Sequence, residues 1–425
     1  MQEYDILIIG GGPSGLSTAL HLARDFPHLA SHILILEKAR YPRPKLCAGG
    51  LVIDAEIILQ RLGLDVSEVP HVDADKIHFD FEAKGLNIDV HKRHALRVIR
   101  RDEFDSWLAK KAIARGIEIR EGVVVKNIVP FQDHVGVETD RGDFRAQVVV
   151  GADGSNGLTR RCIFPNAPVH TARVLEVLTP SLPPPNPTIK IWGAHPLLEL
   201  SDLPSSFHSE DARRGKVSRF AGWWGQAYFD FFPILTNIAG YVWNFPTQVN
   251  GELMRCWGVY DTNILAAEKR PQLKEPLAKE MSRHGFDLEK YEIKGHPIRC
   301  FAPEIQMAVS RVLLVGDAAG ADPFLGEGIS IALGYGSLAA REIGEAFQRD
   351  EFSFNGYKRR VLRSALGQAL FARWFVAHVV YLFKWKWFQI LAWRILKPLT
   401  LLLAWLFILN WGKRLQDTID RIPTI

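Results

Sequence analysis

Tyr4-Asp-Ile-Leu-Ile-Ile-Gly10-Gly-Gly12-Pro-Ser-Gly15 is the stretch that decides the fold of this 425-residue chain. Residues 4–9 are largely apolar, as in a buried parallel strand, and the glycines after them open an apolar-periodic helix over about residues 13–24. A second short apolar run, residues 32–37, follows that helix. The pattern predicts a strand–helix–strand unit and therefore an α/β domain with a doubly wound parallel sheet.

The glycine turn matches G-x-G-x-x-G, a pattern that brings backbone N–H groups against a pyrophosphate at the start of a helix. The second strand ends in a carboxylate, which can accept hydrogen bonds from the ribose hydroxyls of an adenosine. This motif predicts a bound dinucleotide and leaves NAD and FAD as alternatives. The candidate cofactor-binding residues in this part of the chain are Gly10, Gly12, Pro13, Ser14, Gly15, Glu37 and Lys38.

Two further glycine–aspartate turns follow strand-like segments later in the chain. Asp153 and Gly154 come after the first segment, and Gly316 and Asp317 come after the second. An aspartate at the carboxyl end of a strand can accept hydrogen bonds from a polyol, at the sheet edge where α/β domains bind ligands. Each turn alone is equally compatible with an ordinary capped turn.

A helix start rich in small residues follows the last of these turns. Gly326, Gly328 and Ile329 open an apolar helix that runs to about Phe347. Small residues let a flat ring lie against the backbone, and the helix dipole would stabilise negative charge on that ring. The alternative is an ordinary helix start initiated by Pro323.

In this order and spacing, the three motifs resemble the para-hydroxybenzoate hydroxylase-like superfamily of FAD-dependent enzymes. The resemblance implies that FAD is the cofactor, that Asp317 holds its ribityl chain and that Arg101 lies near it. It also implies a doubly wound FAD-binding domain of the glutathione reductase-like type. We expect this domain to carry an inserted, sheet-rich (α+β) substrate domain and a C-terminal helical extension.

Two more segments resemble the geranylgeranyl reductase family of flavoproteins. One is Lys45-Leu-Cys47-Ala48-Gly49-Gly50, and the other is Tyr241-Val-Trp243-Asn-Phe245-Pro246. The resemblance covers roughly residues 1–345. The chain departs from the family where Ala48 separates the cysteine from its glycines and where Thr247 replaces a basic or amide residue. These departures affect the expected substrate more than the expected fold.

The family resemblance implies roles for residues in both segments. The candidate catalytic residues are Cys47, Gly326 and Gly328, and the candidate substrate-binding residues are Tyr241, Trp243, Phe245 and Pro246. Further cofactor contacts are implied for Cys47, Ala48, Gly49, Gly328 and Ile329. The residues themselves leave another interpretation open, because alternating aromatics often fill a core and a lone cysteine is usually an inert small hydrophobe.

The implied reaction is the reduction of isolated C=C bonds in an isoprenoid chain by hydride from reduced FAD. The resemblance implies NADPH or a ferredoxin-like protein as the electron donor. No second G-x-G-x-x-G follows a strand, so we expect no separate NAD(P)H domain. Two alternatives share the FAD motifs: a flavin-dependent monooxygenase or halogenase, and a membrane flavoprotein that passes electrons to quinone. The scattered histidines form no convincing ligand set, so no metal site is expected.

The order of the motifs predicts three domains. The FAD-binding domain would be discontinuous, over residues 1–70, 96–169 and 297–347, and residues 71–95 and 170–296 would form the substrate-binding domain. Residues 348–425 would form a basic, aromatic and helical extension that associates with a membrane.

Charge is distributed unevenly along the chain, whose net charge is +5. Residues 351–425 hold 12 Lys/Arg, 3 Asp/Glu and six of the 12 tryptophans. This tail is apolar between its charges, which favours an anionic membrane surface and disfavours nucleic acid as the partner. Its longest uncharged run, 398–412, is shorter than the roughly 20 residues that a membrane-spanning helix needs.

We therefore expect a peripheral or monotopic protein on the cytoplasmic face of a membrane. The N-terminus has no signal-peptide pattern and the four cysteines are widely spaced, both as expected for that compartment. A helical cap over the substrate cavity is the alternative interpretation of the tail, and the two interpretations are compatible.

Overall fold

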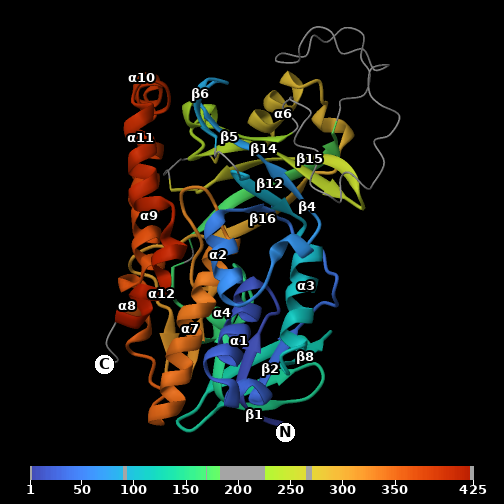
Figure 1. Ribbon diagram of the computed structural model, residues 1–425, viewed down its shortest axis with the longest axis vertical. Helices are drawn as coiled ribbons and strands as arrows, with labels where there is room; N and C mark the ends of the chain where they lie inside the picture. The colour runs from blue at the N-terminus through green and yellow to red at the C-terminus, as the bar shows by residue number, and fades with distance from the viewer. Residues whose placement is uncertain (1, 90–92, 169, 182–224, 265–269, 422–425) are drawn as a thin grey trace.

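A largely parallel sheet carries the glycine turn at the carboxyl end of its first strand, in the lower half of Figure 1. The computed structural model describes residues 2–89, 93–168, 170–181, 225–264 and 270–421. Within these residues the sheet has eight strands: β1 (Gln2–Ile9), β2 (Ile33–Glu37), β8 (Glu118–Glu121), β9 (Val125–Pro130), β10 (Val135–Thr139), β11 (Phe144–Gly151), β17 (Ala308–Val309) and β18 (Val312–Leu314). The strands β18-β11-β1-β2-β8 are parallel neighbours, while β17 and the β10–β9 arm are antiparallel.

Helices cover this sheet because its central strands are apolar and buried on both faces. They are α1 (Pro13–Asp25), α2 (Ile53–Arg61), α3 (Arg101–Ile113), α4 (Leu158–Ile163) and α7 (Ile329–Arg349). Helices α1 and α7, which are far apart in sequence, pack closely: a Cβ at Gly336 would lie only 2.5 Å from Ser17 Oγ. The fold class expected from the sequence is confirmed.

A second sheet of seven strands, counted over the described residues, lies in the upper half of Figure 1. Its order is β16 (Lys294–Arg299), β12 (Thr171–Pro180), β15 (Glu252–Asp261), β14 (Gly240–Val249), β13 (Gln226–Asp230), β5 (Lys76–Asp80) and β6 (Gly85–Asp89). All neighbours are antiparallel except β13 and β5. Helix α6 (Lys274–Arg283) packs on one face, and the other face carries a large aromatic cluster.

The seven-stranded sheet takes strands from both parts of the predicted substrate domain, 71–95 and 170–296. Strand β4 (His71–Ala74) is different, because it joins β3 (Gly50–Leu51) and β7 (Leu96–Ile99) in a separate small sheet. Strand β16 continues across the predicted boundary at residue 297. The domain limits themselves stay a prediction.

The C-terminal segment is helical and runs along one side of the molecule, in red in Figure 1. Its helices are α8 (Tyr357–Arg363), α9 (Ala365–Leu382), α10 (Lys386–Ile390), α11 (Lys397–Leu403) and α12 (Trp411–Arg421), with π-helical turns at Leu391–Ile395 and Ala404–Ile408. Part of it is core: Tyr381 and Trp393 join the aromatic cluster of the second sheet, and Trp411 is fully buried beside α7. Of the described helices, α9 alone has the length and apolarity to cross a membrane, and 44% of that stretch is buried in the protein.

Candidate functional site

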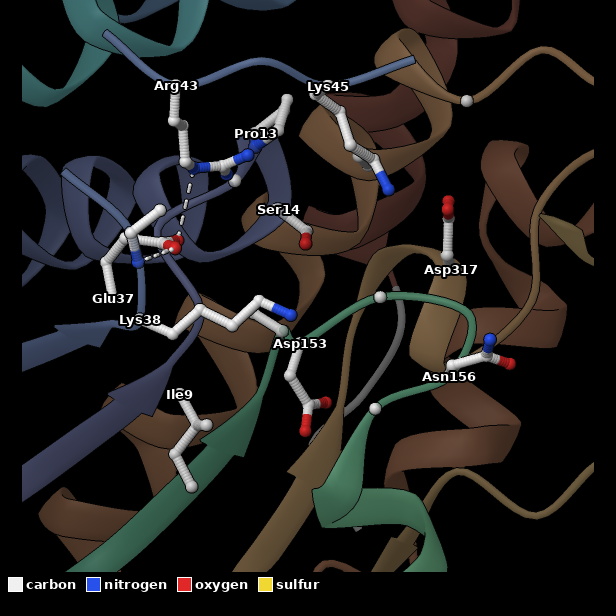
Figure 2. Close-up of a pocket in the computed structure, with 18 of the residues that line it drawn as sticks. Ile9, Pro13, Ser14, Glu37, Lys38, Arg43, Lys45, Asp153, Asn156 and Asp317 are labelled. Carbon is white, nitrogen blue, oxygen red and sulfur yellow. Dashed lines mark hydrogen bonds and ion pairs between the residues drawn. The ribbon is translucent and has the colours of Figure 1, made fainter. Parts of the chain in front are cut away.

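A cavity of about 500 Å³ opens where β1, β2 and β11 end, beside the start of α1. Figure 2 shows residues from several elements around it, with the Lys45 amine pointing toward Asp317. Many of the predicted site residues line this cavity: Gly10, Gly12, Pro13, Ser14, Glu37, Lys38, Cys47, Arg101, Asp153, Gly154, Asp317, Gly326, Gly328 and Ile329. The fold thus brings together residues from four well-separated parts of the chain.

The glycine turn forms an open cradle at the start of α1. Gly10 has φ +106°, and a Cβ there would lie 2.4 Å from the Ala152 carbonyl oxygen, so only glycine fits. For a Cβ at Gly12, the nearest atom outside the neighbouring backbone would be a guanidinium nitrogen of Arg43, at 3.6 Å. This leaves space above the backbone. Helix α1 has no side-chain N-cap and no acidic residue in its first turn. Its free N–H groups and positive dipole end are therefore available to an anion.

Glu37 is buried at the end of β2 and is held beside this turn. Its carboxylate accepts hydrogen bonds from the backbone N–H groups of Gly11 and Ala39, both at 2.9 Å. The Arg43 Nε lies 3.4 Å from the same carboxylate. A carboxylate fixed this way, at the edge of the cavity, is placed to accept hydrogen bonds from ribose hydroxyls.

Asp153 lies at the end of β11, where it also holds the next helix. One carboxylate oxygen accepts hydrogen bonds from the backbone N–H (2.8 Å) and the hydroxyl (3.0 Å) of Thr159 in α4. Burial raises the pKa of Asp153, and these two hydrogen bonds act in the opposite direction. The side chain thus has a structural role in addition to its place in the cavity wall.

Asp317 lies on the opposite wall, next to the start of α7. Ser155 Oγ donates to its carboxylate at 3.1 Å, and a Cβ at Gly328 would lie 3.8 Å from the other carboxylate oxygen. Helix α7, like α1, begins without a side-chain cap or an acidic residue in its first turn. Two uncapped helix starts therefore face one cavity, each able to stabilise negative charge on a ligand.

Arg101, at the start of α3, adds a buried positive charge to the wall. Its guanidinium donates two hydrogen bonds of 2.9 Å to Asp105, which is fully buried. Burial opposes the charge on Arg101, but the Asp105 carboxylate outweighs it, so the pKa of Arg101 is raised. The second partner of Asp105 is Arg43, at 3.2 Å. Asp105 thus fixes both guanidinium groups beside the cavity.

Cys47 lies in the loop between β2 and β3 and lines the cavity near Arg101. The backbone N–H of Gly49 is directed at its sulfur, at 3.4 Å. Burial raises the pKa of the Cys47 thiol, although Arg101 acts in the opposite direction. The thiol therefore keeps its proton at neutral pH.

Four of the predicted cofactor residues do not line the cavity. Gly15 packs against Gly10, and Gly49 packs against the backbone of Ile99. Gly316 lies against Ser14, and Ala48 packs against the aromatic cluster of the second sheet. These residues shape the turns that carry the lining residues.

Several lining residues were not predicted from the sequence. They are Arg43, Lys45, Asn156, Arg161, His296 and Ile298, with apolar positions such as Val123 and Ala332. A signal existed for Arg43 and Lys45, because they flank Pro44 in the loop that was assigned to the site. The sequence carries no comparable signal for His296 and Ile298, which lie on β16 of the second sheet.

The predicted substrate residues lie on the second sheet, and none of them lines the cavity. Tyr241, Trp243 and Phe245 are each 4–5% exposed and point to the same face of β14, in the aromatic cluster. Pro246 lies on the opposite face, because adjacent residues of a strand alternate. The three rings are therefore core residues in this structure, packed with Tyr381 and Trp393.

The aromatic cluster nevertheless adjoins the cavity at two points. A Cβ at Gly50, in the cysteine loop, would lie 3.5 Å from the Phe245 ring. Gly326 lies against the ring of Tyr260, which in turn stacks on Tyr241 at 5.5 Å between centroids. The aromatic cluster thus lies directly behind Gly326 of the cavity wall, while its rings do not line the cavity themselves.

Comparison with known proteins agrees with this geometry. Residues 3–196 match the model of the FAD binding domain family. The open cradle over Gly12 and the two uncapped helix starts fit a dinucleotide with a diphosphate and an electron-accepting ring. FAD is therefore the cofactor, and the chain is an FAD-dependent oxidoreductase.

Two relatives extend the similarity over most of the chain. An uncharacterized protein of Methanosarcina barkeri is 27% identical over 367 residues, which are 86% of this chain and 81% of the relative. The digeranylgeranylglycerophospholipid reductase of Thermoplasma acidophilum is 24% identical, over 83% of this chain and 81% of its own. The resemblance seen in the sequence motifs is thus confirmed by whole-chain similarity.

Solved structures share the fold. A geranylgeranyl bacteriochlorophyll reductase-like protein from Thermoplasma acidophilum superimposes with a TM-score of 0.70 at 19% identity, over 99% of this chain and 96% of that one. A flavin-dependent halogenase gives a TM-score of 0.60 at 21% identity, over 89% and 66%. At these identities the likeness establishes the fold and not the reaction.

Proposed function

We propose that this FAD-dependent oxidoreductase reduces isolated carbon–carbon double bonds in the isoprenoid chain of a membrane lipid or prenylated compound. The observation that supports it most is the aromatic cluster directly behind the cavity, where the Tyr260 ring packs against the lining residue Gly326. An apolar cluster beside the flavin cavity suits an alkene that carries no polar group near the reacting carbons.

Reduction of an alkene adds a hydride to one carbon and a proton to the other. The bound flavin, once reduced, supplies the hydride. The chain's own residues would hold the alkene in the cavity, exclude water and provide the proton. Cys47, whose thiol stays protonated and faces the cavity, is placed to contact the substrate.

We also propose that the substrate is reached from a membrane surface. Most large apolar side chains that the described structure exposes lie between residues 371 and 405. They are Phe371, Phe375, Leu382, Phe383, Trp385, Trp387, Ile395, Leu396, Leu399, Leu402, Leu403 and Trp405. Lys384, Lys386 and Lys397 lie among them, as in segments that bind anionic bilayers through both apolar area and charge. The partner is then the cytoplasmic leaflet, with the protein attached peripherally or monotopically.

The electron donor in this proposal is NADPH or a ferredoxin-like protein. The chain has a single G-x-G-x-x-G turn that follows a strand, and FAD binds at that turn. Electrons would therefore come from a donor that binds transiently to the flavin side of the cavity.

Anaerobic reoxidation of the reduced flavin provides the test. We expect the reduced, FAD-loaded protein to recover its oxidised absorbance when vesicles that contain geranylgeranyl lipids are added, and not with vesicles of the saturated lipids. Reoxidation by oxygen with a chlorinated or hydroxylated product would support the halogenase or monooxygenase, whose fold this chain shares. Reoxidation by quinone without loss of a double bond would support the electron relay.

A further inference from the structure

One carboxylate on the second sheet has no place in the site described so far. Glu176 lies on β12, opposite Gly258 of β15, and Gly258 lies opposite Trp243 of β14. Paired residues on neighbouring strands share a face, so Glu176 shares the face of the aromatic cluster. Gly258 leaves room for the Trp243 ring, since a Cβ there would lie 2.1 Å from it. The carboxylate therefore borders the aromatic cluster that lies behind the cavity.

Glu176 is deeply buried and incompletely paired. It is 4% exposed, and its Oε2 has no hydrogen-bond partner among the described residues. A buried carboxylate with a free oxygen is costly unless the group carries a proton. Burial at this position therefore favours the protonated, neutral form of the Glu176 side chain over the charged carboxylate.

The loop that carries Cys47 lies against this acid. The backbone N–H of Cys47 interacts with the Glu176 carboxylate, whose charge in turn acts to raise the pKa of the Cys47 thiol. Cys47 also lines the cavity, whereas Glu176 does not. Cys47 therefore contacts the buried acid through its backbone N–H and also lines the space that a substrate would fill.

The groups that face Glu176 come from four segments. They are Arg100 before α3, Cys47 in its loop, Cys256 on β15 and Lys294 on β16. Burial raises the pKa of Glu176 to about 7, while Arg100, the Cys47 amide and Lys294 act in the opposite direction. His296, on the same face as Glu176, is neutral because burial, Lys45 and Arg101 lower its pKa to about 4. Glu176 is therefore the acid of this group that exchanges its proton near neutral pH.

We propose that Glu176 supplies the proton for alkene reduction, relayed through the Cys47 thiol, an inference that rests on the proposed function. The thiol S–H bond breaks as its proton forms a C–H bond at one alkene carbon, and the carboxyl proton restores the thiol. The other carbon takes the hydride from the reduced flavin. The products are the saturated chain, oxidised flavin and the Glu176 carboxylate, which regains a proton from water.

The protonation of Glu176 can be measured without any substrate. Infrared difference spectra of the FAD-loaded wild type against Glu176→Gln should show a carboxylic C=O band below pH 7 that disappears above it. The matched control is Asp80→Asn, because Asp80 also has a pKa raised to about 7 but lies near Asp230 and Glu280, toward α6. Absence of a band specific to Glu176 at every pH below 7 would overturn the proposal.

Turnover provides the second measurement. Glu176→Gln should slow flavin reoxidation by the alkene about 10²–10⁴-fold, the usual contribution of a general acid, and should leave dithionite reduction of the flavin unchanged. The wild-type rate should fall as the pH rises through 7, and this limb should vanish in Glu176→Gln and persist in Asp80→Asn. An unchanged rate and pH profile in Glu176→Gln, with an active wild type, would refute the role of Glu176 alone. A wild type that reduces no alkene would refute both proposals.

Discussion

Gly10 and Gly12 lie two residues apart in the cofactor cradle but carry different constraints. Gly10 has a left-handed backbone conformation and contacts the Ala152 carbonyl, whereas Gly12 has open space over its Cα. We predict that Gly10→Ala destabilises the fold itself, because left-handed strain alone costs about 1–2 kcal/mol and the methyl group also clashes.

Gly12→Ala should instead leave the melting temperature of the apoprotein nearly unchanged and weaken FAD binding by at least about tenfold, or about 1.4 kcal/mol. The added methyl would occupy the space over the start of α1 where the diphosphate binds. Thermal denaturation and flavin fluorescence titration separate the two effects. Equal loss of stability in both variants would argue against this division of roles.

Glu176 should also affect the pH dependence of stability. Its pKa is raised from 4.5 to about 7, so between these values the folded protein holds a proton that the unfolded chain has lost. Stability contributed by this group is therefore lost as the pH rises through that window. We expect Glu176→Gln to melt at a higher temperature than the wild type above pH 7, with the difference shrinking toward pH 4.5. A difference that grows at low pH would contradict the assigned pKa.

The place of a residue in the site could be predicted from the sequence where the residue belongs to a local motif. It could not be predicted where strand pairing between distant segments positions the residue. Glu37 and Asp317 follow strands in recognisable turns, and both line the cavity. His296 and Glu176 depend on the register between β16 and β12, which no local pattern specifies. Asp153 was assigned to the cofactor from its motif, yet its hydrogen bonds also hold the start of α4.

At the scale of elements, one buried cluster of charges ties α9 to the loop before α7. Arg373 is 1% exposed, 3.1 Å from Asp322 and 2.6 Å from Glu327. We predict that Arg373→Met costs about 3–5 kcal/mol in urea denaturation, because it leaves two acids without their buried partner. Arg363→Met, at an exposed position of α8, is the matched control and should stay within about 0.5 kcal/mol. A small effect at Arg373 would mean that the acids are protonated or reach water.

The membrane proposal predicts a specific loss of vesicle binding. Replacing Trp385, Trp387 and Trp405 together by Gln should lower affinity for anionic vesicles at least about tenfold, since these exposed rings would enter the interface. Replacing Ile113 and Phe131 by Gln, which are exposed on the FAD-binding domain, should have little effect. Flotation with vesicles measures both. Undiminished vesicle binding by the tryptophan variant would contradict the membrane proposal. A wild-type dimer that the tryptophan substitutions disrupt, and the control substitutions do not, would instead show that this surface binds a second copy of the chain.

The strand that carries the aromatic motif illustrates a limit of pattern reading. The alternation of Tyr241, Trp243 and Phe245 predicts one shared face, and the structure has it. The same alternation sends Pro246 to the other face, which a motif taken as a block does not reveal. Whether such a face meets a ligand or a helix depends on tertiary packing, and here Tyr381 and Trp393 cover it.

For the whole molecule, the order of the motifs was enough to predict a parallel sheet with a second sheet inserted. Each motif closes a strand of the first sheet, and the parallel order of β18, β11, β1 and β2 follows from right-handed crossovers. The dual nature of the tail was harder to predict. Trp411 and Trp393 are buried while Trp385 and Trp405 are exposed, a division that depends on contacts with α7 and the second sheet.

The central claim is the saturation of an isoprenoid chain, and product mass tests it most directly. The FAD-loaded protein is reduced with dithionite without oxygen, incubated with isoprenoid lipid extract, and the lipids are analysed by mass spectrometry. The proposal predicts a gain of two mass units for each double bond reduced, with the FAD-loaded wild type and not with wild-type apoprotein from which FAD has been removed. Unchanged isoprenoid masses, together with flavin that is reoxidised by added quinone or oxygen, would contradict it.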